Sequence, residues 1–205
     1  MNVLSLLLVA PLLAPVVEVL DVPTIQERPH RSEFYSEVAS RISAKDYKYV
    51  LVDQHGKPVD EITVAHEGTH MLHASLGKPG WHGFYLGNGF GFRLKIPENA
   101  RLSDIRVPEH LRTSRYRLYV LDAQRWWNKD VTYLADEALS YLAGAKVRRD
   151  LGWEKRSETV RNGRELTEFF RIAIEKVREK DSDYNTEGLE AVLSYLDNSW
   201  EEFDD

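Results

Sequence analysis

The sequence predicts an α+β fold that is predominantly helical and contains one small sheet. Through the second half of the chain, apolar residues recur at spacings of three and four, which is the period of an amphipathic helix. Strand-like patterns are short and occupy residues 47–52 and 90–96. With 205 residues, of which 42% are hydrophobic, the chain is long enough to form one domain with a sizeable core.

Composition excludes several classes of function. The formal net charge is −6, so the chain lacks the basic balance of nucleic-acid-binding proteins and we expect no nucleic-acid partner. It contains no cysteine, which excludes both disulfide bonds and thiolate metal sites. Any bound metal must therefore be held by histidine, aspartate or glutamate side chains.

The chain begins with a largely apolar run over residues 3–19, interrupted by Pro11 and Pro15. This run is too short and too often interrupted by proline for a stable membrane span. We expect residues 1–22 to be a secretory signal peptide, which would make the protein secreted or periplasmic. The alternative is an N-terminal apolar arm that packs on the domain, and a cytoplasmic location is then expected. In both cases residues 23–205 are expected to form a single domain.

The first helix of this domain is expected to begin at Ser32 and to end near Lys45, with Phe34, Val38 and Ile42 as its buried stripe. A short strand over residues 47–52 follows, and residues 54–57 form a turn into the next helix. The small sheet is therefore expected to precede that helix. Such a strand would offer an edge along which an extended chain could lie.

The next helix is expected between Asp60 and Gly77. Pro58 and the acidic pair Asp60 and Glu61 are typical of a helix N-terminus, and Gly77 followed by Pro79 is typical of a C-terminus. One face of this helix carries residues spaced three or four apart, namely Ile62, Ala65, His66, Thr69, His70 and His73.

Beyond this helix, residues 78–88 and 90–96 predict a loop and a strand that together make a hairpin. A helix is expected from Pro108 to about Trp127, in which Trp126 and Trp127 pack in the core or between helices. Further helices are expected to form a C-terminal helical layer, over residues 130–149, 158–180 and 186–203.

The helix after Asp60 contains the motif H-E-x-x-H over residues 66–70. Two histidines four residues apart on a helix lie about 5–6 Å apart at Cβ and point the same way, so both can reach one Zn²⁺ at roughly 2.0–2.1 Å. Glu67 lies at the edge of the same face, where its carboxylate can take a proton from water that the metal activates. The alternative is a surface helix with incidental histidines, and the helix signals on both sides of the motif favour the zinc site.

A catalytic zinc site needs a third protein ligand and an open position for water. His73 shares the face of the two histidines, but seven residues of helix separate it from His66 by about 10.5 Å along the axis, too far to share one ion. Glu137 is the better candidate, because it lies on an apolar stripe of the helix expected over 130–149, where an unpaired carboxylate is costly. Its neighbour Asp136 has more polar surroundings, so we expect Glu137 to face the histidines.

This pattern resembles the gluzincins, the thermolysin-like zinc metallopeptidases, in which an H-E-x-x-H helix is completed by a glutamate from a later helix. Residues 66–70 match the first element residue for residue, and Glu137 is the match for the second. The resemblance covers these two helices and the preceding strand. It implies a metallopeptidase domain over residues 23–205 that uses Zn²⁺ and acts on a peptide or protein substrate. It also implies a role for each site residue, with Glu67 as the catalytic base and His66, His70 and Glu137 as metal ligands.

Two other functions stay open at the level of the sequence. One is a zinc-dependent amidase acting on cell-wall peptide or another non-protein substrate. The other is a non-catalytic, zinc-stabilised binding or regulatory module, against which the intact Glu67 argues because a structural zinc needs no general base. A serine hydrolase is disfavoured, since the chain has no G-x-S-x-G motif. The candidate donors to a developing oxyanion are Tyr141, His82 and His110.

Overall fold

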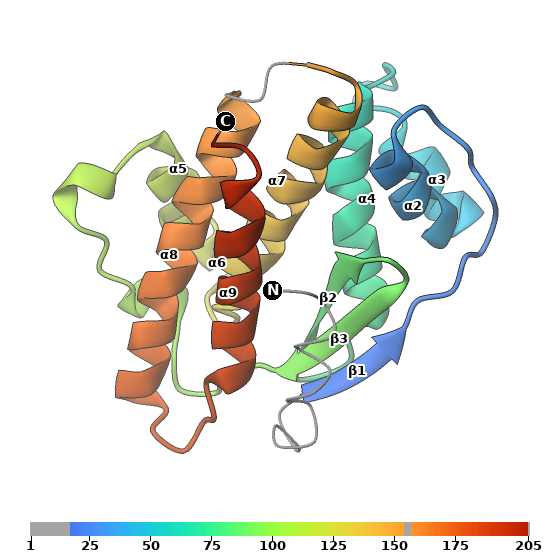
Figure 1. Ribbon diagram of the computed structural model, residues 1–205. Helices are drawn as coiled ribbons and strands as arrows, with labels where there is room; N and C mark the ends of the chain where they lie inside the picture. Colours follow the sequence, from blue (N-terminus) through green and yellow to red (C-terminus); the bar gives the residue numbers. More distant parts are fainter. Residues whose placement is uncertain (1–16, 154–156, 205) are drawn as a thin grey trace.

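The computed structural model describes residues 17–153 and 157–204 and has an α+β fold, mostly helical, with a three-stranded antiparallel sheet. The predicted fold class is therefore confirmed. In Figure 1 the long helices α4 and α7 lie side by side, with α8 and α9 covering one side of α7 and α2 and α3 beyond α4. The sheet lies at one end of α4.

The sheet consists of β1 (Val17–Asp21), β2 (Trp81–Gly87) and β3 (Phe90–Lys95), in the order β1-β3-β2. The hairpin expected over residues 78–96 is present, although the segment expected as its loop contains β2. Its turn places Asn88 and Gly89 at φ of 56° and 75°, as a tight two-residue hairpin turn requires. Only β1 precedes α4 in the chain, so the prediction that the sheet precedes this helix is wrong for two of its three strands.

The strand expected over residues 47–52 is absent. The helix expected from Ser32 to about Lys45 ends earlier, as α2 (Glu33–Arg41). A second helix, α3 (Ala44–Val50), takes up most of the segment expected as a strand. The side chain of Ser43 accepts a hydrogen bond from the Asp46 amide and so begins the second helix, a cap that competes successfully with the β-branched and aromatic residues that follow. The expected peptide-binding edge before α4 is therefore also absent.

Strand β1 lies within the segment that was expected to be a signal peptide or a packed arm. It pairs with β3, and its Glu18 carboxylate binds Lys78 and Arg93. Residues 17–21 thus pack on the domain as the arm alternative predicts. Residues 1–16, which carry most of the predicted signal peptide, lie outside the described residues, and that prediction stays untested.

Helix α4 (Glu61–Leu76) has the predicted ends. The Asp60 side chain accepts from the Thr63 amide at its beginning, and the Gly77 amide donates to the carbonyls of Ala74 and His73 at its end. Helix α7 (Tyr133–Asp150) packs against it at the centre of the molecule and is buried along most of its circumference.

The helix expected from Pro108 to Trp127 is broken into short pieces. These are η3 (Glu109–Leu111), α5 (Ser114–Tyr116), the π-helical η4 (Arg117–Asp122) and α6 (Gln124–Trp127), preceded by the 3₁₀ turn η2 (Leu102–Asp104). Val120 and Ala123 are buried. Trp126 is 70% exposed, so the prediction that it packs in the core or between helices is wrong. Trp127 is 41% exposed but stacks on the ring of Tyr133 in α7, with 5.1 Å between ring centroids, so it packs between helices as predicted.

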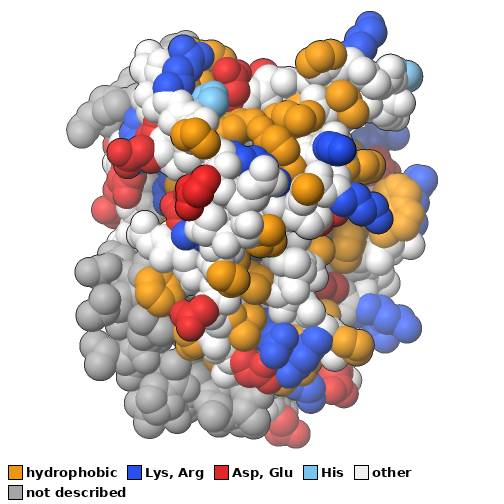
Figure 2. Space-filling model, turned by 90° about the vertical axis from the view of Figure 1, so that its right-hand side faces the viewer, with side chains coloured by type: hydrophobic (Ala, Val, Ile, Leu, Met, Phe, Trp, Pro, Cys, Tyr) orange, Lys and Arg blue, Asp and Glu red, His pale blue; other side chains and the backbone are white. Residues whose placement is uncertain are grey.

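The C-terminal helical layer is formed by α8 (Glu158–Lys180) and α9 (Glu187–Glu201), close to the predicted boundaries. Their apolar stripes join α7 and the β2–β3 hairpin in the main hydrophobic core. Within the described ranges, no helix combines the length and apolar character that crossing a bilayer requires. On the face shown in Figure 2, acidic and basic side chains are interspersed with hydrophobic ones.

Candidate metal site

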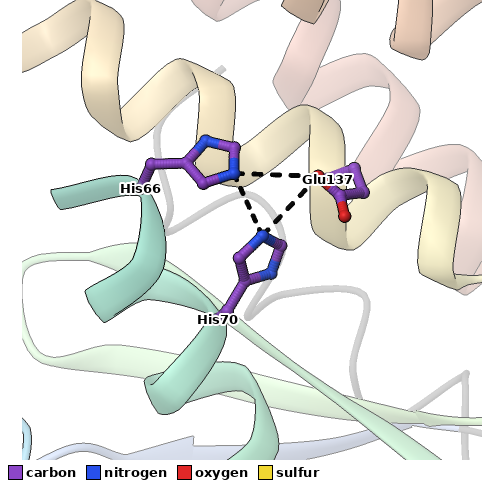
Figure 3. A group of neighbouring side chains, drawn as sticks. All are labelled: His66, His70 and Glu137. Atoms are coloured by element: carbon purple, nitrogen blue, oxygen red, sulfur yellow. Dashed lines mark hydrogen bonds and ion pairs between the residues drawn. The ribbon is translucent and has the colours of Figure 1, made fainter. Parts of the chain in front are cut away.

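Three side chains predicted to be metal ligands converge between α4 and α7 (Figure 3). The Nε2 atoms of His66 and His70 lie 3.1 Å apart. The Oε2 atom of Glu137 lies 3.7 Å from the first and 3.6 Å from the second. Although His70 and Glu137 are 67 positions apart in the sequence, the two helices bring two imidazoles and one carboxylate to a single point.

The spacing of these atoms suits a bound cation. Ligands that hold an ion tetrahedrally at roughly 2.0–2.1 Å are separated from one another by about 3.3–3.4 Å, and the three observed separations lie on both sides of that value. The Oε2 atom of Glu137 is buried and has no hydrogen-bond partner among the described residues, which is costly without a cation nearby. Together His66, His70 and Glu137 could hold a metal ion.

Each histidine is also held through its other ring nitrogen or ring face. His70 Nδ1 donates to Asp136 Oδ1 at 2.6 Å, which leaves its Nε2 directed at Glu137. His66 has a hydrogen bond to the backbone of Ser140 and packs edge-on against the ring of Tyr141, with 4.7 Å between ring centroids. Such supporting contacts orient histidine ligands and fix their tautomer.

The Asp136 carboxylate is a hub for three histidines. Its Oδ1 also accepts from His73 Nδ1 at 2.8 Å, and its Oδ2 accepts from His82 Nε2 at 2.8 Å. His82 in turn donates through Nδ1 to Asp130 at 2.7 Å. The result is a buried chain that runs from Asp130 through His82 and Asp136 to the candidate ligand His70.

This hub is not a second metal site. Although His70, His73 and Asp136 form a group with ligand-type atoms close together, the 2.6 Å and 2.8 Å separations within it are those of hydrogen bonds. They are shorter than the roughly 3.3 Å that two ligands of one tetrahedral ion require. His73, which is too far from His66 to share one ion, is buried and supports the site through Asp136.

The electrostatics of the cluster follow from burial and from these contacts. Burial, reinforced by the neighbouring His70, lowers the pKa of His66 to about 3, so its Nε2 lone pair is available. Burial opposes the charge on His82, but Asp130 and Asp136 outweigh it and raise the pKa of His82 to about 10. Burial would raise the pKa of Asp136, yet its histidine partners hold that pKa well below its usual range.

A cleft of about 760 Å³ opens directly onto the three candidate ligands. Glu67 lines it beside His66 and His70, and burial raises the pKa of its carboxyl, with the charge of Glu137 acting in the same direction. The first residues of the edge strand β2 also line the cleft. Its aromatic walls come from separate elements and comprise Trp81, Tyr119, Trp127 and Tyr133.

The three residues predicted as oxyanion donors differ in position and in hydrogen-bond partners. His82 lines the cleft, but both of its ring nitrogens are bound by carboxylates. The Tyr141 ring packs on His66 and its hydroxyl pairs with that of Tyr119, while His110 is exposed on η3. The cleft hydroxyls that the sequence did not single out are those of Tyr119 and Tyr133.

The supporting chain was likewise missed in the sequence. Asp136 was expected in more polar surroundings and His82 as a donor to an oxyanion, and Asp130 was expected only as the first residue of a helix. One signal was available, because four of the seven histidines of the chain fall within residues 66–82.

No family model, no curated protein and no solved structure matches this chain.

Proposed function

We propose that the protein is a zinc-dependent metallopeptidase. The observation that carries the proposal is the convergence of His66, His70 and the unpartnered Oε2 of Glu137 at separations of 3.1–3.7 Å, at the floor of a cleft. Two imidazoles and one carboxylate are a ligand set that zinc hydrolases use, and they leave one position open. The gluzincin resemblance of the sequence supports the same assignment.

The assignment of zinc rests on the donors together with Glu67. Two histidines and a carboxylate also bind non-haem iron, but the glutamate beside His66 in H-E-x-x-H is the general base of zinc hydrolases. With no cysteine in the chain, a copper or iron site built on thiolates is excluded. When bound, Zn²⁺ supplies a Lewis acid that lowers the pKa of a water molecule and polarises a carbonyl. His66, His70 and Glu137 would hold the ion, and Asp136 would keep the His70 ring in the orientation that this requires.

Glu67 supplies the proton transfers. It lines the cleft beside both histidines, so its carboxylate would take a proton from the attacking water and then give that proton to the leaving amine nitrogen. The raised pKa of its carboxyl brings the group closer to neutral pH, where a general base and acid is most effective. The Tyr119 hydroxyl lines the cleft and can accept a hydrogen bond from Tyr141, so its own proton would be available to the oxyanion.

The proposed substrate is a peptide in an extended conformation. Strand β2 is at the edge of the sheet, and its residues 81–83 line the cleft, so a substrate strand could lie beside them. The aromatic side chains of the cleft would contact apolar side chains of such a peptide.

The test is to measure bound metal in the purified protein and chelator-sensitive cleavage of a mixed peptide library. Glu67→Gln should keep the metal, because no ligand changes, and should lose nearly all hydrolysis. Glu61→Gln, in the first turn of the same helix and outside the cleft, is the matched control and should keep both properties. Wild-type turnover in the Glu67→Gln variant, or absence of any bound divalent metal, would contradict the proposal.

A further inference from the structure

The segment between the hairpin and α7 exposes an unusual amount of apolar surface. Among the described residues, ten large hydrophobic side chains are exposed, and four of these lie within ten consecutive positions. They define what we name the 118–127 patch, made of Leu118 (47% exposed), Leu121 (45%), Trp126 (70%) and Trp127 (41%). Large apolar side chains exposed so close together in the chain are typical of a site of interaction.

Backbone hydrogen bonds and two buried side chains fix the segment that carries the patch. The Ala123 amide donates to the Leu118 carbonyl, the i to i+5 bond of a π-helical turn, and Trp127 donates to the Ala123 carbonyl in the next turn. Val120 and Ala123 are buried in the core. The polypeptide therefore presents these side chains from an anchored segment, and their exposure is a property of the fold.

The segment that carries the patch has a charge opposite in sign to that of the whole chain. Residues 101–129 contain seven Lys and Arg against three Asp and Glu, whereas the complete chain has a net charge of −6. The Arg125 guanidinium lies 4.8 Å from the centre of the Trp126 ring. The exposed cations on this segment are Arg106, Arg112, Arg117, Arg125 and Lys129.

We propose that the 118–127 patch docks the protein on an anionic lipid surface. Tryptophan and leucine side chains partition into the boundary between headgroups and acyl chains, and arginine and lysine bind the anionic headgroups beside them. An acidic protein is repelled by such a surface unless its contact region is basic, as this one is. Charge complementarity thus favours a lipid surface over a symmetric contact between two copies of the patch, which would bring like charges together.

Docking would also place the cleft at the membrane. Trp127 belongs to the patch and lines the cleft, and Tyr119 in η4 lines it too. The mouth of the cleft would then face peptide segments close to the lipid surface. The docking itself does not depend on the proposed peptidase activity.

The test is co-sedimentation of the purified protein with vesicles of phosphatidylcholine alone and of phosphatidylcholine with about 30% phosphatidylglycerol. We expect binding to the anionic vesicles only, weakened as salt is raised because the charges are screened. Trp126→Ala should lower the partition coefficient about tenfold, as loss of one buried aromatic side chain does. Tyr49→Ala is the matched control, since Tyr49 is also 70% exposed but lies on α3, and it should bind as the wild type does.

A second pair of variants tests the charges. Arg117→Glu with Arg125→Glu should remove most binding to anionic vesicles, whereas Arg161→Glu on α8 should not. Circular dichroism should be unchanged in all variants, because each substituted side chain is exposed. No binding to anionic vesicles at low salt, or equal losses in the Trp126 and Tyr49 variants, would overturn the proposal. So would a dimer, measured by light scattering, that Trp126→Ala converts to a monomer.

Discussion

Two neighbouring residues on α7 contact opposite nitrogens of the same imidazole. Glu137 Oε2 lies 3.6 Å from His70 Nε2, and Asp136 Oδ1 lies 2.6 Å from His70 Nδ1. Successive residues of a helix point about 100° apart, and from that angle the sequence predicts that only one of the two can face the histidines. Because an imidazole presents nitrogens on two edges, both carboxylates reach it, and each has a different role.

Substitution of the hub carboxylate tests these roles. Asp136→Asn removes the charge that orients His70, and we expect its zinc affinity to fall about 10- to 100-fold, the usual effect of losing a contact behind a metal ligand. Asp130→Asn removes a charge only from the far side of His82, so a smaller loss is expected.

Zinc dissociation constants from competition with a chromophoric chelator would measure both effects. Glu137→Ala, His66→Ala and His70→Ala should bind far less metal than either variant, because each removes a ligand. Equal affinities in the Asp136 and Asp130 variants would contradict the orienting role. Unchanged affinity in Glu137→Ala would remove the third ligand and the gluzincin assignment with it.

At the scale of elements, the site depends on close approach of β2 to the C-terminal end of α4. A Cβ added at Gly83 would lie 2.4 Å from the carbonyl oxygen of His73 and 2.7 Å from the Gly77 amide nitrogen. Both are backbone atoms that cannot move independently of the helix. His82, next to this glycine, supplies the donors to Asp136 and Asp130.

Gly83→Ala should therefore destabilise the protein by about 1–3 kcal/mol, the usual cost of overpacking. It should also weaken metal binding, since β2 must move and His82 with it. Gly144→Ala is the control, because the new Cβ would lie 2.9 Å from the Cγ2 methyl of Ile62 and 3.5 Å from the nearest backbone atom, and its effect should be smaller. Urea unfolding and metal titration of both variants would measure the changes in stability and in metal affinity. A larger loss of stability in Gly144→Ala would contradict this expectation and show that the contact between α4 and α7 tolerates less added volume than the contact between β2 and α4.

Strand β1 is a further element whose contribution can be measured. It pairs with β3 along its whole length, and Glu18 binds Lys78 and Arg93. A chain that begins at Val17 should be more stable to urea than one that begins at Pro23, which lacks the strand. Equal stability of the two truncated proteins would show that β1 adds nothing to the sheet.

At the scale of the whole molecule, metal binding and folding are linked. The candidate ligands join α4 to α7, which belong to two hydrophobic clusters, so an ion bound there would bind the folded state alone. A ligand at 100 times its dissociation constant adds about 2.7 kcal/mol to the free energy of unfolding. For a protein of this size that corresponds to several degrees in the unfolding temperature.

We therefore expect a chelator to lower the thermal midpoint of the wild type and restored zinc to raise it. The His66→Ala variant should show neither change, since it lacks a ligand. A midpoint that is the same with and without chelator, in protein shown to contain metal, would contradict this linkage.

The sequence by itself determined the α4 helix, its ends and the histidine pair. The reason is that these features are local. The Asp60 side chain caps the helix by accepting from the amide of Thr63, and a spacing of four residues places both histidines on one face. It also determined α8 and α9, whose apolar stripes are regular. The prediction of one continuous helix from Pro108 to Trp127 is wrong, because the breaks in this segment depend on packing against other elements.

Only the tertiary structure decided the relation between distant segments. In the folded protein Asp136 contacts three histidines, the first residues of β2 line the cleft, and Trp126 is exposed. Each of these outcomes depends on which surfaces of separate elements meet. A local pattern cannot specify this, because burial and charge pairing are set by neighbours that lie far away in the chain.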